Sequence, residues 1–203
     1  FTAAGLDPGE HGSAITDAGT PLEAQAKAWG FRRCFSHGAS SGSDVGGRFS
    51  ALTYFGLVPA SLLGLDTERL LARAAEMLGR CGPEIQAPDN PALVLGALLG
   101  ELALAGKDKL TILSAPPLAG FGTWLEQLVA ESTGKSGKGI VPIDGEPPRD
   151  QARYAADRVF IELQLAHELD AAVAAKAEAL GAAGYPVVRI HWQDRYDLGG
   201  EVI

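Results

Sequence analysis

The segment Ser43–Ser50, with the sequence SDVGGRFS, combines residue types that can bind an anion. Gly46 and Gly47 can adopt a positive φ or let the backbone approach a ligand closely, because they lack a Cβ. A helix that begins after them would present free N–H groups and the positive end of its dipole, and the planar guanidinium of Arg48 suits an oxyanion or an enediolate. The same spacing is also typical of a glycine-rich helix entry with a surface arginine, so the residues alone leave both interpretations open.

The segment Trp124–Lys138, WLEQLVAESTGKSGK, is a second candidate because it places a glutamine and a glutamate on one helix face. Gln127 and Glu131 are four residues apart and are therefore neighbours on a helix. Glu126 and Glu131 are five residues apart, about 140° around the helix, so they do not form a carboxylate pair. Glu131 could serve as a general base, although the residues alone favour an ordinary solvated glutamate on an amphipathic helix.

The remaining polar residues indicate simpler roles. Asp17–Thr20, DAGT, follows an expected strand and could bind an anion at the next helix, or could be a plain turn. Cys34 and Cys81 lack the spacing of a metal or redox motif. The acidic residues near the C-terminus, Asp194, Asp197 and Glu201, are typical of a polar turn rather than a metal cluster. We therefore expect neither a metal nor a cofactor.

Length and composition exclude several classes of protein. The 203 residues suit one ordinary domain or two small ones. A hydrophobic content of 46% with 21% charged residues is typical of a globular chain and not of a disordered one. The 17 basic and 25 acidic residues give a net charge of −8, which argues against nucleic-acid binding through bulk charge. No apolar run approaches the roughly 18 residues of a membrane span.

The two cysteines and the N-terminus bear on where the protein resides. Two cysteines cannot form a disulfide framework, which fits a reducing compartment, so we expect a cytoplasmic protein. The N-terminus shows no signal segment. The chain begins with Phe1 and not with Met, so we expect a processed chain or a piece of a longer protein.

Short apolar or β-branched runs bounded by turn residues predict strands. The predicted strands are Ser13–Thr16, Arg32–Phe35, Lys109–Ser114, Gly139–Ile143, Arg158–Leu163 and Val187–Trp192. Segments of helical periodicity lie between them. The predicted helices are Leu22–Trp29, Phe49–Leu63, Thr67–Leu78, Pro91–Ala105, Leu118–Ser132 and Leu169–Ala183. The helix over Phe49–Leu63 is apolar enough to be buried on most sides.

Strands that alternate with helices predict an α/β fold. The strands are almost continuously apolar, which is typical of a sheet covered on both faces. We therefore expect a three-layer sandwich with a mainly parallel sheet flanked by helices. In such sheets ligands bind beyond the carboxyl ends of the strands, so the strand-to-helix turns are where chemistry is expected.

Two segments resemble glucose-6-phosphate isomerases. Residues 44–66, DVGGRFSALTYFGLVPASLLGLD, resemble the signature in which a Gly-Gly-Arg-aromatic-Ser/Thr turn opens a helix of the C-terminal sugar-isomerase (SIS) domain. Residues 126–142, EQLVAESTGKSGKGIVP, resemble the family segment with Gln, three positions, Glu and then Gly-Lys. The resemblance extends over most of the chain and is strongest to the bacterial form fused behind a transaldolase, which implies an SIS-like fold.

The resemblance implies roles for four residues. Glu131 falls on the glutamate that moves the proton between C1 and C2 of the open-chain sugar phosphate, and Arg48 falls on the arginine that stabilises the cis-enediol intermediate. Gly47 falls on the glycine beside the substrate, and Gln127 falls on the glutamine that helps to hold it. The implied reaction interconverts glucose 6-phosphate and fructose 6-phosphate without a metal.

The chain also departs from this family. His37–Ser43, HGASSGS, is a polar insert whose glycine and serine content predicts a flexible loop. The phosphate-binding loop of the N-terminal SIS domain and the C-terminal lysine segment have no counterpart in the sequence. No histidine matches the family's ring-opening histidine, and we expect His191 to be structural. We therefore expect one SIS-like domain over residues 1–203, as a piece of a longer isomerase.

Two functions follow from these observations. The resemblance implies an isomerase domain that binds a sugar phosphate, pairs with the N-terminal SIS domain of the same enzyme and forms a homo-oligomer, with neither nucleic acid nor a membrane as a partner. The alternative is a non-catalytic SIS module that binds a phosphosugar or mediates dimerisation, because the phosphate loop and the lysine segment are absent.

Overall fold

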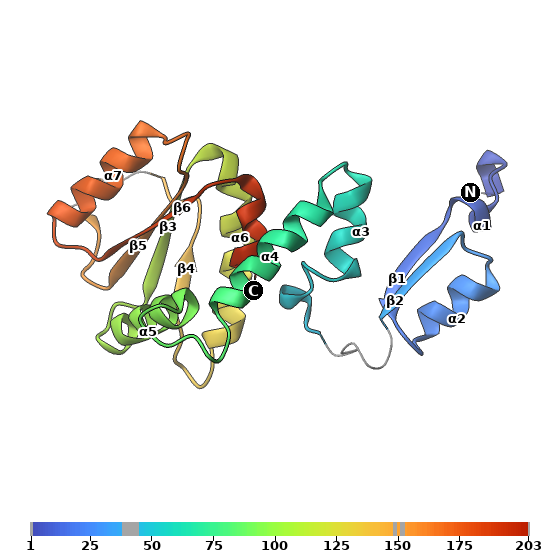
Figure 1. The fold of residues 1–203 in the computed structure, drawn as a ribbon, viewed down its shortest axis with the longest axis horizontal. Helices are drawn as coiled ribbons and strands as arrows, with labels where there is room; N and C mark the ends of the chain where they lie inside the picture. Colours follow the sequence, from blue (N-terminus) through green and yellow to red (C-terminus); the bar gives the residue numbers. More distant parts are fainter. Residues whose placement is uncertain (1, 38–44, 148–149, 151–152, 203) are drawn as a thin grey trace. The chain divides into compact units, whose positions relative to one another are not determined.

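The computed structural model of the protein describes residues 2–37, 45–147, 150 and 153–202 (Figure 1). Within these residues the chain forms two compact units, one that ends at Leu71 and one that runs from Ala72 to Glu201. Each unit has its own parallel sheet. The single domain over residues 1–203 stays a prediction, and each unit is described by itself.

The first unit is built on two parallel strands, β1 (Ser13–Asp17) and β2 (Arg33–His37), paired from Ser13↔Arg33 to Asp17↔His37. Helix α2 (Pro21–Ala28) connects them. It begins at Pro21 because the Thr20 hydroxyl accepts from the backbone N–H of Glu23 and proline suits the first helical position. Shorter helical segments precede β1: η1 (Thr2–Ala4) and α1 (Pro8–His11).

The predicted helix over Phe49–Leu63 is divided. A 3₁₀ turn, η2 (Gly47–Phe49), comes first, and α3 (Tyr54–Leu62) begins where the Thr53 hydroxyl accepts from the N–H of Phe55. The prediction that this segment is buried on most sides is wrong, because α3 has no buried residue. An apolar composition predicts burial only when other elements of the chain cover the helix.

The second unit has a four-stranded sheet in the order β4-β3-β5-β6, parallel throughout. Its strands are β3 (Lys109–Ser114), β4 (Val141–Ile143), β5 (Arg158–Leu165) and β6 (Val187–Trp192). Helix α4 (Thr67–Arg80) begins in the first unit, and its residues from Ala72 on belong to the second. The other helical segments of the second unit are α5 (Pro91–Leu104), η3 (Pro116–Leu118), α6 (Ala119–Thr133), α7 (Ala171–Ala182), η5 (Arg195–Asp197) and α8 (Leu198–Glu201).

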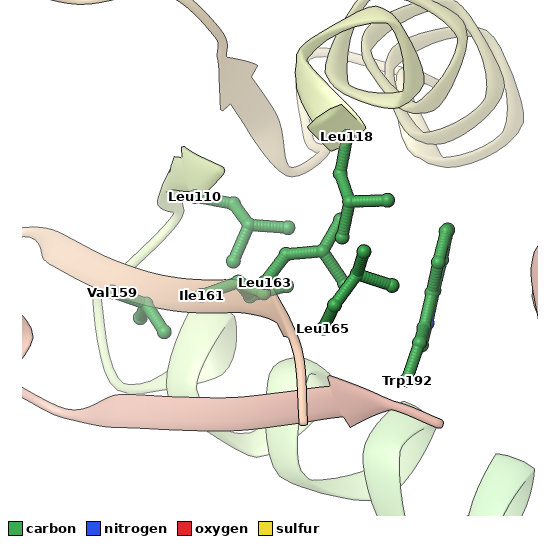
Figure 2. Close-up of a cluster of buried hydrophobic side chains, with 7 residues drawn as sticks. All are labelled: Leu110, Leu118, Val159, Ile161, Leu163, Leu165 and Trp192. Atoms are coloured by element: carbon green, nitrogen blue, oxygen red, sulfur yellow. The ribbon is translucent and has the colours of Figure 1, made fainter. Parts of the chain in front are cut away.

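Side chains of β5 alternate between the two faces of this sheet, as the pleat of a strand requires. On one face Val159, Ile161, Leu163 and Leu165 form a buried cluster, against which side chains of α5 and α6 pack. Figure 2 shows the other members of the cluster gathered around these side chains: Leu110, Leu118 and Trp192.

The opposite face of the sheet is covered by α7. Phe160 of β5 is fully buried there with Tyr154 and with Leu180 of α7. Helices therefore cover both faces of the sheet in this unit (Figure 1). The predicted α/β fold, a parallel sheet flanked by helices in three layers, is confirmed.

Two of the six predicted strands have the predicted bounds, and the other four differ from them by one or two residues at one or both ends. β3 and β6 begin and end at the predicted residues. β4 begins at Val141 and not at Gly139, because Gly139 has a φ of 154° that a strand does not use. His37, assigned by the sequence to the polar insert, is the last residue of β2; the rest of the insert lies outside the described residues. No helix in the described parts of the chain is long and apolar enough to cross a membrane.

Candidate functional site

Arg48 lies in the short η2 turn of the first unit. Its guanidinium carbon is 4.6 Å from the centre of the Phe49 ring, a cation–π distance that limits where the side chain can point. Gly46 has a φ of −57°, and Gly47 is not among the glycines with positive φ. A left-handed backbone is therefore not the reason for these glycines.

The space around Gly47 offers a different reason for a glycine. A Cβ added to Gly47 would meet no atom within 4 Å. The backbone is thus open on this side, which permits close approach of a ligand. This geometry agrees with the role that the sequence predicts for Gly47 beside a substrate, and it does not test that role.

The DAGT turn between β1 and α2 is already occupied by a carboxylate. The N–H of Gly19 donates to Oε2 of Glu23 at 2.7 Å. This hydrogen bond, followed by that from Lys27, lowers the pKa of the Glu23 carboxyl. A negative charge at the turn opposes anion binding, so the structure favours the plain-turn interpretation of Asp17–Thr20.

Gln127 and Glu131 lie side by side on α6 in the second unit. The amide nitrogen Nε2 of Gln127 donates to Oε1 of Glu131 at 3.5 Å, and both residues are exposed. The spacing of four residues therefore places the two side chains together as predicted. Because the carboxylate is oriented by a neighbour and open to solvent, a substrate can reach it.

A tight turn fixes the end of the helix that carries Glu131. Lys135 and Lys138 exchange backbone hydrogen bonds of 2.9 and 3.0 Å. Gly139 follows with a φ of 154°. The hydroxyl of Thr133, near the end of α6, accepts from the N–H of Ile140 at 2.9 Å, which joins the helix end to the start of β4.

This connection places Glu131 at the amino edge of the parallel sheet. β4 begins at Val141, which pairs with Lys109, the first residue of β3. Glu131 therefore does not lie at the carboxyl ends of the strands, where the sequence pattern predicts chemistry. The rule describes where ligands bind most often in open α/β sheets, whereas this carboxylate lies where a helix returns to the sheet.

Replacing Gly139 by Ala should destabilise this turn. An added Cβ would lie 2.9 Å from the Cα of Gly134, in a conformation that residues with a side chain rarely adopt. We expect a loss of about 1–3 kcal/mol in the free energy of unfolding, measured by urea denaturation. Gly120→Ala in α6, where an added Cβ meets nothing within 4 Å, is the control and should not destabilise the protein. If Gly139→Ala and the parent had equal unfolding midpoints, a side chain at position 139 would not strain the turn, and the prediction would be wrong.

The predicted site residues divide between the two units. Gly47 and Arg48 belong to the first, and Gln127 and Glu131 belong to the second. Within the second unit the structure brings Gln127 and Glu131 together. The assembly of both pairs into one site stays a prediction.

The polar turn near the C-terminus is confirmed for two of its three acidic residues. Oδ1 of Asp194 accepts from the N–H of Tyr196 at 2.8 Å, and Oδ2 of Asp197 accepts from the N–H groups of Gln193 and Asp194. Glu201 differs, because it is partly buried and accepts from Nε1 of Trp192 at 3.2 Å. Burial is the main reason that the pKa of the Glu201 carboxyl is raised, and the charge of Asp197 also raises it.

The raised pKa of Glu201 predicts a pH-dependent effect of Glu201→Gln. The folded state holds the proton more tightly than the unfolded state, so its contribution is complete below the ordinary pKa of 4.5. That contribution is lost as the pH rises through the pKa of the folded state. Urea unfolding should therefore show that the stability of Glu201→Gln relative to the parent increases between pH 4 and pH 7.5. A difference that is equal at both pH values, or that decreases, would contradict this prediction.

A buried polar network on β5 was missed by sequence reasoning. Glu162 is 3% exposed, and its carboxylate accepts from Nε2 of Gln164 at 2.6 Å and from Nε of Arg189 at 3.0 Å. Nε2 of His191 lies 3.4 Å from the same carboxylate. This contact agrees with a structural role for His191. The signal was available, because Glu162 and Gln164 interrupt an otherwise apolar strand at alternate positions.

Metal ligation receives no support from geometry: within the described ranges, no group of three or more His, Cys, Asp or Glu side chains is arranged to hold a metal ion.

Sequence comparison identifies relatives for about half of the chain. A probable glucose-6-phosphate isomerase from Haloarcula marismortui is 41% identical over 108 residues, 53% of this chain and 24% of that protein. The glucose-6-phosphate isomerase from Rubrobacter xylanophilus is 42% identical over 113 residues, 53% of this chain and 25% of that protein. No protein-family model matches the chain.

Half of the chain is homologous to glucose-6-phosphate isomerases. The resemblance to this family is thereby confirmed over about half of the chain. A third glucose-6-phosphate isomerase, from Methanocaldococcus jannaschii, is 39% identical over 109 residues, which are 53% of this chain and 27% of that protein. The chain thus spans about a quarter of the length of these isomerases.

Structural comparison agrees on the fold. A hypothetical protein from Thermus thermophilus superposes with a TM-score of 0.75 over 94% of this chain and 54% of its own, at 22% identity. This likeness concerns the fold alone. The roles of Gly47, Arg48, Gln127 and Glu131 come from the resemblance to glucose-6-phosphate isomerases and stay predictions.

Proposed function

We propose that this chain is the part of a glucose-6-phosphate isomerase that supplies the base and the charge-stabilising arginine for interconverting glucose 6-phosphate and fructose 6-phosphate. One observation carries the proposal. In a chain that is 41% identical to such an isomerase over half its length, Gln127 and Glu131 lie side by side near the end of α6.

Glu131 acts first as a base and then as an acid. Its carboxylate takes the proton from C2 of the open-chain aldose, the C–H electron pair forms the C1–C2 double bond, and the π electrons of the C1 carbonyl move onto O1, which takes up a proton to give the cis-enediol. The hydroxyl at C2 then loses its proton as the C2 carbonyl forms, and Glu131 delivers its proton to C1, which gives the ketose. These proton transfers need no oxidant, reductant or metal, and a positioned carboxylate is a suitable group to carry them out. The amide of Gln127 keeps the carboxylate oriented between the two transfers.

Arg48 stabilises the negative charge that develops on the enediol oxygen atoms. That charge is absent from the substrate, so the interaction lowers the barrier instead of merely strengthening binding. Its stacking on Phe49 restricts the guanidinium, and the open backbone at Gly47 allows the sugar to approach.

Further parts of the proposal come from the resemblance. We expect the N-terminal SIS domain of the same enzyme to supply the phosphate-binding loop, and we expect a homo-oligomer, with neither nucleic acid nor a membrane as a partner. Fusion behind a transaldolase and location in the cytoplasm are predictions of the same kind.

The second candidate function is a non-catalytic SIS module that binds a phosphosugar or mediates dimerisation. On this alternative the site residues would hold a sugar phosphate without converting it.

A coupled assay separates the two functions. The purified chain is given fructose 6-phosphate, and the glucose 6-phosphate produced is oxidised by an NADP-dependent dehydrogenase. The same assay is repeated with the chain extended by the flanking segments of its natural protein, and with mannose 6-phosphate as a competing substrate. Turnover in either form supports the isomerase. Binding of fructose 6-phosphate without turnover in both forms would support the module instead.

A further inference from the structure

The sheet of the first unit is only two strands wide in the described part of the chain, although helices lie on both of its faces (Figure 1). Oγ of Ser36 in β2 donates to Oε1 of Glu23 in α2 at 3.5 Å. The preceding residue of the strand, Phe35, contacts Tyr54 of α3 with ring centres 5.8 Å apart. Neighbouring residues of a strand point to opposite faces, so α2 and α3 cover different faces. This is the layering of an open parallel sheet, reduced to two strands.

The first unit buries few apolar side chains for its size. Among its described residues the buried apolar side chains are Ala14, Ala26 and Leu70, and two of these three are alanines. Leu62 at the end of α3 and Leu63 after it are 83% and 80% exposed. By contrast, the buried clusters described above belong to the second unit. The described residues of the first unit therefore lack the apolar core that an independent domain needs.

The outer edges of β1 and β2 lack the features that prevent a further strand from pairing. The two strands are paired over consecutive residues from Ser13↔Arg33 to Asp17↔His37, without a bulge. Neither strand contains proline or lysine, and the charges of Asp17 and Arg33 lie at strand ends. Each outer edge carries backbone N–H and C=O groups that β1 and β2 do not use for each other. The sheet can therefore accept another strand.

The residues before β1 indicate the direction from which such a strand comes. Parallel strands are joined by crossover connections that are usually helical. The helical segments η1 and α1 lie before β1, and Gly12 alone separates α1 from the strand. The N–H of Arg32, just before β2, donates to the carbonyl oxygen of Gly12 at 3.0 Å, which fixes the end of α1 at the amino edge of the sheet. A helical segment that enters a parallel strand at this edge is typical of the last part of a crossover.

The related proteins are long enough to supply further strands. The Thermus thermophilus protein shares the fold over 94% of this chain, so the match includes most of the first unit, and the match covers 54% of that protein. We propose that a strand from the part of the natural protein that precedes residue 1 pairs in parallel with this two-stranded sheet. The first unit is then the last part of a larger α/β domain, and the predicted single domain over residues 1–203 divides between the two units.

Amide hydrogen exchange tests this proposal on three proteins. They are the present chain, the chain extended at its N-terminus by the preceding segment of its natural protein, and the chain extended only at its C-terminus. In the N-terminal extension, amides of residues 13–17 and 33–37 should exchange about 100-fold more slowly than in the present chain, because the sheet no longer opens from an edge. Residues 109–114 and 158–165 form internal strands of the second unit. Their exchange should be equal in all three proteins, which shows that each is folded.

The C-terminal extension is the matched control and should leave exchange in β1 and β2 as it is in the present chain. Repeating the measurement over a range of protein concentrations tests a second copy of the chain as the rival occupant of the edge. The proposal is overturned if the N-terminal extension does not slow exchange, if the C-terminal extension slows it equally, or if protection in the present chain rises with concentration to the same level. None of these outcomes depends on turnover, so they are independent of the proposed isomerase activity.

Discussion

Glu131→Gln is expected to lower kcat/KM for the conversion of fructose 6-phosphate about 100- to 10,000-fold, because the amide cannot accept the proton from carbon. The side chain keeps its size, and its oxygen can still accept from Gln127. Binding of the sugar phosphate should therefore change little, and the loss should appear in kcat. The coupled assay measures it in the chain, or in the extended chain if turnover requires the flanking segments.

The matched control for this variant is Glu126→Gln, which removes an exposed carboxylate on the same helix five residues away. It should retain the activity of the parent. A Glu131→Gln protein with more than a tenth of the parent activity would show that another group carries the proton. Solvent-exchange labelling at C2 of the sugar provides a second readout, since exchange through the enediol should be lost together with turnover.

Arg48→Lys is expected to lower kcat about 100- to 1000-fold, the typical loss when one donor to a developing oxyanion is removed. Lysine keeps the positive charge, but it loses the planar fork and the stacking on Phe49. KM should change less than kcat, because the charge that the fork stabilises is absent from the bound sugar.

Arg33→Lys is the control for the arginine, since Arg33 is exposed at the start of β2 in the same unit. It should leave kcat unchanged. If Arg48→Lys raised KM and spared kcat, Arg48 would be a substrate-binding residue and would not stabilise the intermediate.

The parts of the fold that were predictable depend on local patterns. Lys109–Ser114 and Val187–Trp192 became strands with the predicted bounds because each is a short apolar or β-branched run with polar or turn residues beside it. Gln127 and Glu131 are adjacent for the same reason, because a spacing of four residues is decided within one helix.

The parts that were not predictable depend on contacts between elements. α3 begins at Tyr54 because the side chain of Thr53 caps it. This hydrogen bond to the backbone competes with the continuous helix from Phe49 that the sequence predicts. The burial of Glu201 arises only when β6 and α8 pack together, so the sequence presents it as one more acidic residue near the end of the chain.

The turn that joins α6 to β4 also limits how this region can vary in length. Thr133 is hydrogen-bonded to Ile140, and Lys135 is hydrogen-bonded to Lys138. An additional residue between Glu131 and Thr133 would rotate the carboxylate by about 100° around the helix axis relative to the Thr133–Ile140 hydrogen bond. An additional residue between Ser136 and Gly137 would enlarge only the tip of the turn. Insertions can therefore accumulate at the tip without changing the direction of the carboxylate, whereas the helical segment before it has a fixed length.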